Sequence, residues 1–333
     1  MMLLKGMTWR RALGWGLALV ILIFLIRTLW SSWDQVAQSG FTFQFNLPLL
    51  ILSLVLLVPG RSFGVEAWRR ILRALGDSIS FRFAIYAWFV SNLARFIPGN
   101  VWQVAAMMML TENAGVSKLN VVLSQAVYAV IALSVAALYG LTLLPLPASD
   151  APLIALAFGA LIVLFALPAV FQWMVKVSTR LLRIVRRNQT IPEPRVIHTT
   201  FWQGLIPPLC SFLFWSINGL AFWLFVRSIT DISIETIPAF IGMNAAAYFI
   251  GYVSFITPSG LGFREASLAL FLGAFFPAPV AVAIAFLTRV WSIAGEMLGV
   301  SLAVWWRPKE SPVAGRQSPV PSHPSSVVRP PSK

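Results

Sequence analysis

The chain of 333 residues is 58% hydrophobic and 11% charged, and 25 Lys and Arg against 11 Asp and Glu give it a net charge of +14. A soluble domain has about 25% charged residues, so this composition excludes a soluble enzyme and indicates a chain that lies mostly in lipid. In a membrane protein a basic excess predicts cytoplasmic loops that face anionic head groups, so no nucleic-acid partner is expected.

Cysteine and histidine offer little chemistry in this sequence. The single cysteine, Cys210, excludes an intrachain disulfide. The two histidines, His198 and His323, lie in polar segments without a Cys or carboxylate partner at metal-ligand spacing. We therefore expect no metal site and no cofactor.

The first apolar run, Ala12 to Trp30, follows three basic residues near the N-terminus. It is longer than the roughly 7 to 15 residues of a signal-peptide core and no small-x-small cleavage site follows it, so a retained first span is expected. Five further runs each have close to the ~20 residues that cross ~30 Å of hydrocarbon. These runs are Leu47 to Gly64, Leu119 to Leu144, Pro152 to Trp173, Gly204 to Phe225 and Val280 to Val304.

Two other apolar stretches, Phe83 to Asn113 and Ile237 to Phe276, are too long for one span and are interrupted near the middle. Pro removes a backbone donor and Gly permits a turn, so each interruption predicts a broken helix. The breaks are Pro98, Gly99 and Asn100 in the first stretch, and Pro258, Gly260 and Gly262 in the second. About 15 residues on each side of Pro98 give roughly 22 Å, which favours a re-entrant hairpin. In the second stretch Ile237 to Ile256 is long enough to span, which weakens the hairpin prediction there.

The basic residues favour a topology in which both broken stretches are hairpins and both termini are cytoplasmic. The segments Arg61 to Arg82 and Lys176 to Arg195, with five and six basic residues, then lie inside. The segments Ser31 to Asn46 and Asp231 to Glu235, which lack Lys and Arg, lie outside. If only one of the two broken stretches crossed the membrane as a single helix, the basic segments would no longer all lie on the cytoplasmic side.

Pro98 and Pro258 align the two breaks as a weak internal repeat whose hairpins enter from opposite sides. The fold class is therefore an all-α polytopic membrane protein with about six full transmembrane helices plus two re-entrant hairpins in an inverted repeat. Its membrane domain is residues 1–306, with halves of about 1–150 and 151–306, and a disordered Pro/Ser-rich basic tail follows in 307–333. Paired broken helices are typical of a substrate site near the bilayer midplane. Helix kinks with a packing role remain the alternative.

Five charged residues fall inside apolar segments, where a charge costs roughly 2.5 to 3.5 kcal/mol and usually faces a partner or a polar cavity. We expect Arg95, Arg264 and Arg289 to receive a lipid phosphate, because the planar guanidinium can donate two parallel hydrogen bonds. Glu265 would keep the site from being uniformly positive. The alternative is a set of buried ion pairs, Arg289 with Glu265 or Glu296, that fixes helix packing. Secondary candidates are Asn92, Gln103, Asn244 and Glu296.

The run from Thr257 to Glu265, Thr-Pro-Ser-Gly-Leu-Gly-Phe-Arg-Glu, followed by Leu287-Thr288-Arg289, resembles the transmembrane, flippase-like domain of the lysylphosphatidylglycerol synthase family. The segment Trp68 to Gly76 and the Ile97-Pro98-Gly99 element with Gly115 are similar as well. The resemblance covers nearly the whole chain up to about Trp306. It implies an integral prokaryotic membrane protein that handles lipids and, in the best-known members, moves an aminoacylated phospholipid between leaflets.

Two departures from that family pattern bear on function. Many relatives have Gly-Glu after the first turn, whereas Trp102-Gln103 stands here. Members that synthesise the lipid also have a large soluble aminoacyl-transfer domain, and the tail of this chain is too short for one. Lipid synthesis is therefore not expected.

The leading prediction is a plasma-membrane flippase or transporter that moves a phospholipid or other phosphorylated lipid along a groove between the two hairpins. Its partners are membrane lipids, anionic or phosphorylated, and it is not an enzyme. A membrane-embedded lipid or polyprenyl-phosphate transferase is the first alternative, although Asp34, Asp77, Asp150 and Asp231 stand alone and form no paired metal site. The second is a non-catalytic accessory subunit that works with a membrane enzyme of lipid or glycolipid synthesis.

Overall fold

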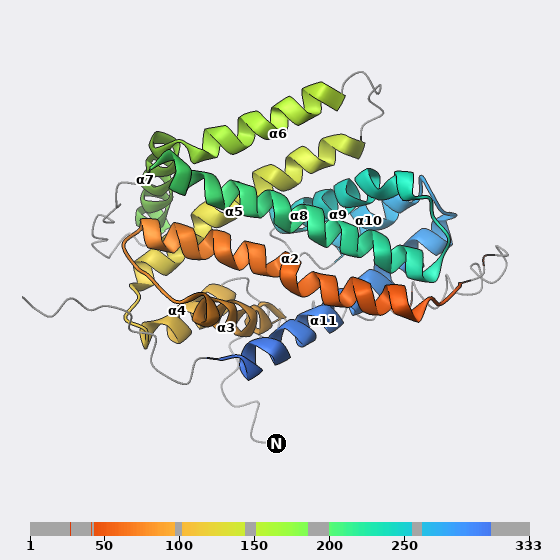
Figure 1. Ribbon diagram of the computed structural model, residues 1–333, viewed down its shortest axis with the longest axis horizontal. Coiled ribbons are helices and arrows are strands. Elements are labelled where there is room, and N and C mark those ends of the chain that lie inside the picture. The colour runs from red at the N-terminus through yellow and green to blue at the C-terminus, as the bar shows by residue number, and fades with distance from the viewer. Residues whose placement is uncertain are drawn as a thin grey trace, which may run out of the picture.

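The structure is a computed structural model that describes residues 43–96, 102–143, 151–185, 200–254 and 262–307, together with Arg27 and Phe41. Within these ranges it is all helical (Figure 1). The α-helices are α2 (Leu47–Ala74), α3 (Phe81–Asn92), α4 (Trp102–Glu112), α5 (Lys118–Gly140), α6 (Ala151–Ala166), α7 (Pro168–Val185), α8 (Phe201–Ile229), α9 (Ile237–Val253), α10 (Phe263–Leu272) and α11 (Ala278–Trp305). Short 3₁₀ turns are η1 (Leu93–Phe96), η2 (Leu141–Leu143) and η4 (Ile234–Thr236).

Five of these helices are long and apolar enough to cross a membrane: α2, α5, α8, α9 together with η4, and α11. The longest, α8, has 29 residues and is about 43 Å long at 1.5 Å per residue, enough to cross with some tilt. The predicted all-α polytopic membrane fold is confirmed. The expected first span, Ala12 to Trp30, lies outside the described residues apart from Arg27.

The predicted span Pro152 to Trp173 is not one straight helix. Helix α6 ends at Ala166, and α7 leaves at an angle of 71° from Pro168. Proline disfavours helical backbone in the residue before it, so Leu167 is where the chain bends. The described chain therefore has five candidate spans, or six if the bent pair is counted as one.

Helix α7 stands across the long helices at one end of the molecule (Figure 1). Phe171, Met174 and Val175 on one side of it are buried against the core. Other sides expose the apolar Trp173, Leu181 and Ile184, and the basic Lys176 and Arg180. A helix with protein-facing, apolar and basic faces is typical of a membrane interface.

Helix α2 is longer than predicted and continues past Gly64 to Ala74. Its N-cap is Asn46, whose side chain accepts from the Leu49 N–H at 3.2 Å. Its C-cap is Leu75, and the next residue, Gly76, has a φ of 98°. The segment Arg61 to Arg82, expected as a cytoplasmic loop, is therefore helical over its first half. Arg61 lies in the middle of a membrane-length helix.

The first predicted hairpin consists of α3 and α4, with 12 and 11 residues. At about 18 and 17 Å, neither can cross the hydrocarbon core alone. The two helices pack against each other, and Gln103 Nε2 donates a hydrogen bond of 2.6 Å to Asn92 Oδ1. This bond joins the two helix ends that flank the break, so the chain turns back on itself there.

The second predicted hairpin consists of α9 and α10, which also pack against each other. Helix α10 has 10 residues and is too short to cross, whereas α9 with η4 has 20. A Cβ at Gly251 of α9 would lie 2.9 Å from the Cβ of Arg264, so the start of α10 lies against the end of α9. The two hairpins therefore differ in the length of one arm. The inverted relation between the chain halves is not shown and stays a prediction.

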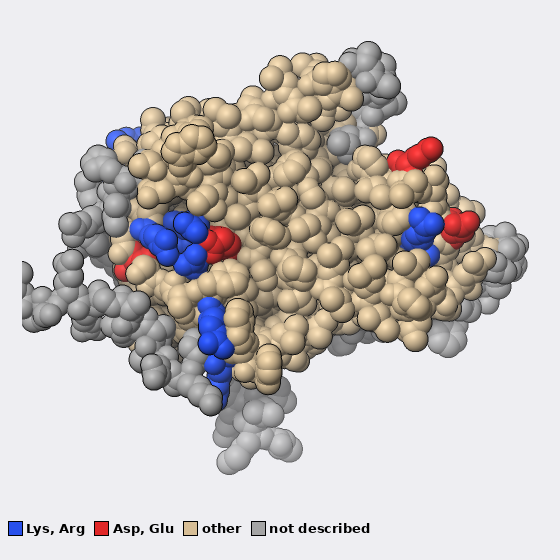
Figure 2. All heavy atoms as spheres, viewed as in Figure 1, with Lys and Arg blue, Asp and Glu red and all other residues tan. Residues whose placement is uncertain are grey.

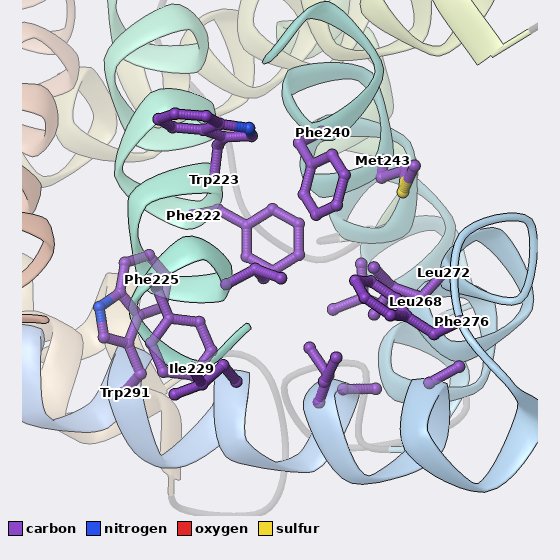
Figure 3. Packing of buried hydrophobic residues seen from close by; sticks show 14 of the residues in the cluster. Phe222, Trp223, Phe225, Ile229, Phe240, Met243, Leu268, Leu272, Phe276 and Trp291 are labelled. Atoms are coloured by element: carbon purple, nitrogen blue, oxygen red, sulfur yellow. The ribbon is translucent and has the colours of Figure 1, made fainter. Parts of the chain in front are cut away.

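An apolar cluster holds the second hairpin in place (Figure 3). Phe222 of α8, Phe240 of α9 and Leu268 of α10 point toward one another in it. The rings of Phe225 and Trp291 stack with centroids 5.1 Å apart, and Trp291 Nε1 donates to Ser53 Oγ of α2 at 2.9 Å. The cluster thus fixes α10 against α8 and α11, and it positions the charged residues at the start of α10.

The charged residues visible on one face gather at the two ends of the long helices, and a broad band without charge lies between them (Figure 2). The larger basic group lies over the C-terminal end of α2, which carries Arg69, Arg70 and Arg73. Such a band fits a bilayer that crosses the long helices at their middle. The assignment of the basic end to the cytoplasm stays a prediction from the positive-inside rule.

Candidate functional site

Helix α11 is the element around which the membrane-embedded charges gather. It packs against α2, α3 and α10. A Cβ at Gly295 would lie 2.3 Å from Leu57 Cδ1 of α2, and one at Gly299 would lie 2.2 Å from the Phe89 ring of α3. Small residues four apart let membrane helices approach closely, so this pair brings α11 into contact with both neighbours. Glu296, directly after Gly295, is buried there.

Glu296 forms an ion pair with Arg95, in which Arg95 Nη2 donates to Glu296 Oε2. Arg95 belongs to η1, next to the first break, so this pair joins the first hairpin to α11. The Glu296 side chain is 1% exposed. The close approach of α2 and α3 encloses Glu296 within the helix bundle.

Arg289 forms the corresponding contact with the second hairpin, and its Nη1 donates to Glu265 Oε1 at 3.3 Å. The other carboxylate oxygen of Glu265 accepts the Gly262 N–H at 2.8 Å and so caps the first turn of α10. Gly262 has a φ of +88°, a conformation that favours glycine. Both oxygens of Glu265 are therefore occupied. Arg289, whose guanidinium has five N–H donors, makes only this hydrogen bond within the described part of the chain.

Arg61 also belongs to the site, although the segment that it begins, Arg61 to Arg82, was expected on the cytoplasmic side. Its Nη2 donates to the backbone oxygen of Ser292 at 3.2 Å and to Ser292 Oγ at 3.4 Å. Gly60 and Gly64 flank it; a Cβ at Gly60 would meet Asn218 at 2.8 Å and one at Gly64 would meet the Tyr128 hydroxyl at 2.7 Å. The Gly-x-x-x-Gly spacing around Arg61 was the signal in the sequence for helix packing at this depth.

Arg264, the second residue of α10, completes the group, and no hydrogen bond of its side chain occurs among the described residues. It lies within electrostatic range of Glu265, Arg95 and Glu296, as Arg61 does of Glu296, Arg95 and Arg264. We call the six residues the central charge cluster. They are Arg61, Arg95, Arg264, Glu265, Arg289 and Glu296. Four guanidinium groups against two carboxylates leave it a formal charge of +2.

The central charge cluster lies near the middle of the spans. Arg61 is the fifteenth residue of α2 and Arg289 the twelfth of α11, in helices of 28 residues each. At 1.5 Å per residue these positions are about 21 Å and about 17 Å from the helix N-termini. A positive charge at such a depth is costly unless an anion offsets it, so anion binding is the chemistry that the cluster offers.

The family profile described as "Lysylphosphatidylglycerol synthase TM region" matches residues 11–298 of the chain. The chain belongs to this family. The match includes every residue of the central charge cluster. Membership of the lysylphosphatidylglycerol synthase TM family supports a membrane function related to lipids. Searches of curated proteins and of solved structures each returned no match.

The remaining predicted residues of this family member lie at different places. Asn92 and Gln103 bond to each other across the first break, so they join the arms of the hairpin. Asn244 is buried in α9, and no hydrogen bond joins it to the central charge cluster among the residues described. Of the predicted break residues Gly262 is described, and the others, Pro98, Gly99, Asn100, Pro258 and Gly260, lie outside the described ranges.

Proposed function

We propose that the protein is a lipid flippase or transporter of a prokaryotic plasma membrane, and that the central charge cluster receives the phosphate of a phospholipid or another phosphorylated lipid. The observation that carries this proposal is a formal charge of +2 among membrane-spanning helices, where the two carboxylates are buried and the four arginines are partly buried. A phosphate group would offset this charge. Arg264 and Arg289 support it further, because most of their N–H donors are not used by the described residues.

The two ion pairs suggest how the head group passes. Arg95 is tied to α11 by Glu296, and Arg289 ties α11 to α10 through Glu265. A phosphate that enters the cluster competes with each carboxylate for its guanidinium, and it thereby loosens one hairpin from α11. Opening of one hairpin at a time would expose the head group to one leaflet and then to the other, as in transporters with paired broken helices.

The test uses purified protein in proteoliposomes with head-group-labelled phospholipids and a membrane-impermeant quencher. We expect wild-type protein to expose the inner-leaflet label and Arg289→Ala to slow this exposure. Loss of a hydrogen bond to a charged group costs about 1.5 to 3 kcal/mol, which corresponds to a decrease of roughly 10- to 100-fold. Arg227→Ala is the matched control, since Arg227 lies in the last turn of α8 against the Trp223 ring and away from the cluster.

Three outcomes separate the candidate functions. Movement that depends on Arg289, with lipid of unchanged mass, supports the transporter. A change in lipid mass that consumes an added donor would identify a transferase instead. No movement of any lipid, in vesicles that stay intact, would contradict the proposal and favour an accessory subunit.

A further inference from the structure

We propose that Arg61 and Glu296 form a subsite for a hydroxyl group of the lipid head group, beside the phosphate. This inference rests on the proposed function and adds to it the class of head group. Two buried polar atoms in the described residues lack a hydrogen-bond partner, and both lie in this place. They are Arg61 Nη1 and Glu296 Oε1.

The two atoms belong to neighbouring side chains of the same contact between α2 and α11. Arg61 bonds through Nη2 to Ser292, which lies one helical turn before Glu296 on α11. Of the charged groups around Arg61, Glu296 exerts the strongest electrostatic effect. The close approach at Gly295 keeps this region tightly enclosed. A buried donor and a buried acceptor without partners thus belong to side chains that meet in one contact between α2 and α11.

The chemistry of these atoms selects the group that would satisfy them. A guanidinium nitrogen can only donate, and the Glu296 carboxylate, paired through Oε2 with Arg95, can only accept. The bridging group must therefore accept from Arg61 and donate to Glu296. A hydroxyl does both, whereas a phosphate oxygen only accepts and an ammonium only donates.

A buried water has the same donor and acceptor capacity as a hydroxyl, so the experiment must separate the two. A head-group hydroxyl makes recognition selective, because an analogue without it leaves a buried guanidinium nitrogen and a buried carboxylate oxygen unpaired. If a bound water satisfies both atoms instead, the rate of lipid movement will not depend on a hydroxyl in the head group.

The experiment compares two lipids with the same acyl chains and the same charge in the quencher assay. The first is phosphatidylglycerol and the second is phosphatidylpropanol, whose head group has the same carbons without the hydroxyls. Both have the label on an acyl chain, so the head groups stay intact. We expect the wild-type protein to move the glycerol lipid at least about tenfold faster, the effect of one unsatisfied charged hydrogen bond.

For each variant the measured quantity is the rate for phosphatidylglycerol divided by the rate for phosphatidylpropanol. A general loss of folding or activity lowers both rates alike and leaves this ratio unchanged. Arg61→Met removes the donor and replaces a charge with an apolar chain of similar length. Glu296→Gln keeps the shape and an oxygen for Arg95, so it serves if Arg61→Met does not purify as a folded protein. Each is expected to lower the ratio clearly, because each removes one of the two partners of the hydroxyl. Arg227→Met is the matched control and should keep the wild-type ratio.

The outcomes separate this subsite from the proposed function. Movement of both lipids by the wild-type protein at equal rates would mean that water fills the gap, and it would overturn the subsite alone. A ratio that is as high in both variants as in the wild-type protein would also overturn it, because the hydroxyl would then be recognised elsewhere. No movement of either lipid would overturn the proposed function and the subsite together.

Discussion

Glu265 shows how one buried residue can serve the backbone and a site at once. Its two oxygens accept from the Gly262 N–H at the start of α10 and from Arg289 of α11. The sequence analysis assigned Glu265 the role of moderating positive charge. The contacts add a more local role, since the carboxylate fixes both the first turn of α10 and the direction of the Arg289 guanidinium.

We expect Glu265→Ala to lower the free energy of unfolding by about 3 kcal/mol, because it leaves the guanidinium of Arg289 and a helix N-terminus without their acceptor. The measurement is thermal unfolding of the purified protein in detergent. Glu112→Ala is the control, since Glu112 pairs with Lys118 at 2.7 Å but both side chains are more than half exposed. That pair should contribute less than about 1 kcal/mol. Equal effects of the two substitutions would contradict the role given to Glu265.

Arg61 shows that the position of a charged residue in the sequence does not reveal its partner in the folded protein. The run Leu47 to Gly64 contained Arg61, yet the positive-inside pattern counted this residue with the following loop. Its true partner, Ser292, is 231 residues away, and only the packing of α2 on α11 brings the two together. Arg264, Glu265 and Arg289 could be proposed because each stands in an apolar segment. Their pairing could not, because it depends on which helices touch.

Contacts between helices bring the residues of the central charge cluster together. Gly295 and Gly299 on α11, and Gly60 and Gly64 on α2, each bracket a charged residue. Gly295 and Gly299 bring α2 and α3 close to α11, and the Glu296 side chain between them is enclosed as a result. Gly60 and Gly64 bring α8 and α5 close to α2, so the same spacing accounts for tight packing in both helices.

We expect Gly299→Ala to destabilise the protein by about 1 to 3 kcal/mol, because the added methyl group would overlap the buried ring of Phe89 and push α3 away from α11. Thermal unfolding in detergent measures this loss. Gly159→Ala is the matched control, since a Cβ at Gly159 of α6 meets nothing within 4 Å. Alanine favours helix over glycine, so this control should be neutral or stabilising. A loss at position 159 as large as at 299 would exclude overlap with Phe89 as the cause.

The lengths of apolar runs predicted most helices correctly, since membrane thickness alone limits them. The sequence also located the first break, because α3 and α4 are separate short helices on either side of Pro98. The bend at Leu167 was missed. A count of apolar residues passes straight through Leu167-Pro168, and the effect of a proline on the preceding residue gives the better signal.

At the scale of the whole molecule, the topology makes a prediction about two exposed turns. Ser117 precedes α5 and Ser233 precedes η4, and the hairpin topology puts them on opposite sides of the membrane. On a Cys210→Ser background, we expect Ser117→Cys to react with an impermeant thiol reagent only from the cytoplasmic side and Ser233→Cys only from outside. Reaction of both from one side would mean that α6 and α7 do not together cross the membrane. Ser117→Cys reacting only from outside and Ser233→Cys only from the cytoplasm would mean that the first broken stretch crosses it.

Helix α11 presents a carboxylate to one hairpin and a guanidinium to the other, on positions seven residues apart. Because both attachments are on one continuous helix of 28 residues, α11 cannot shift toward one hairpin without changing its contact with the other. The two hairpins are therefore coupled through one helix. If the protein moves lipids as proposed, this coupling would keep both sides from opening together without a separate device, because the helix that releases one hairpin would be the helix that holds the other.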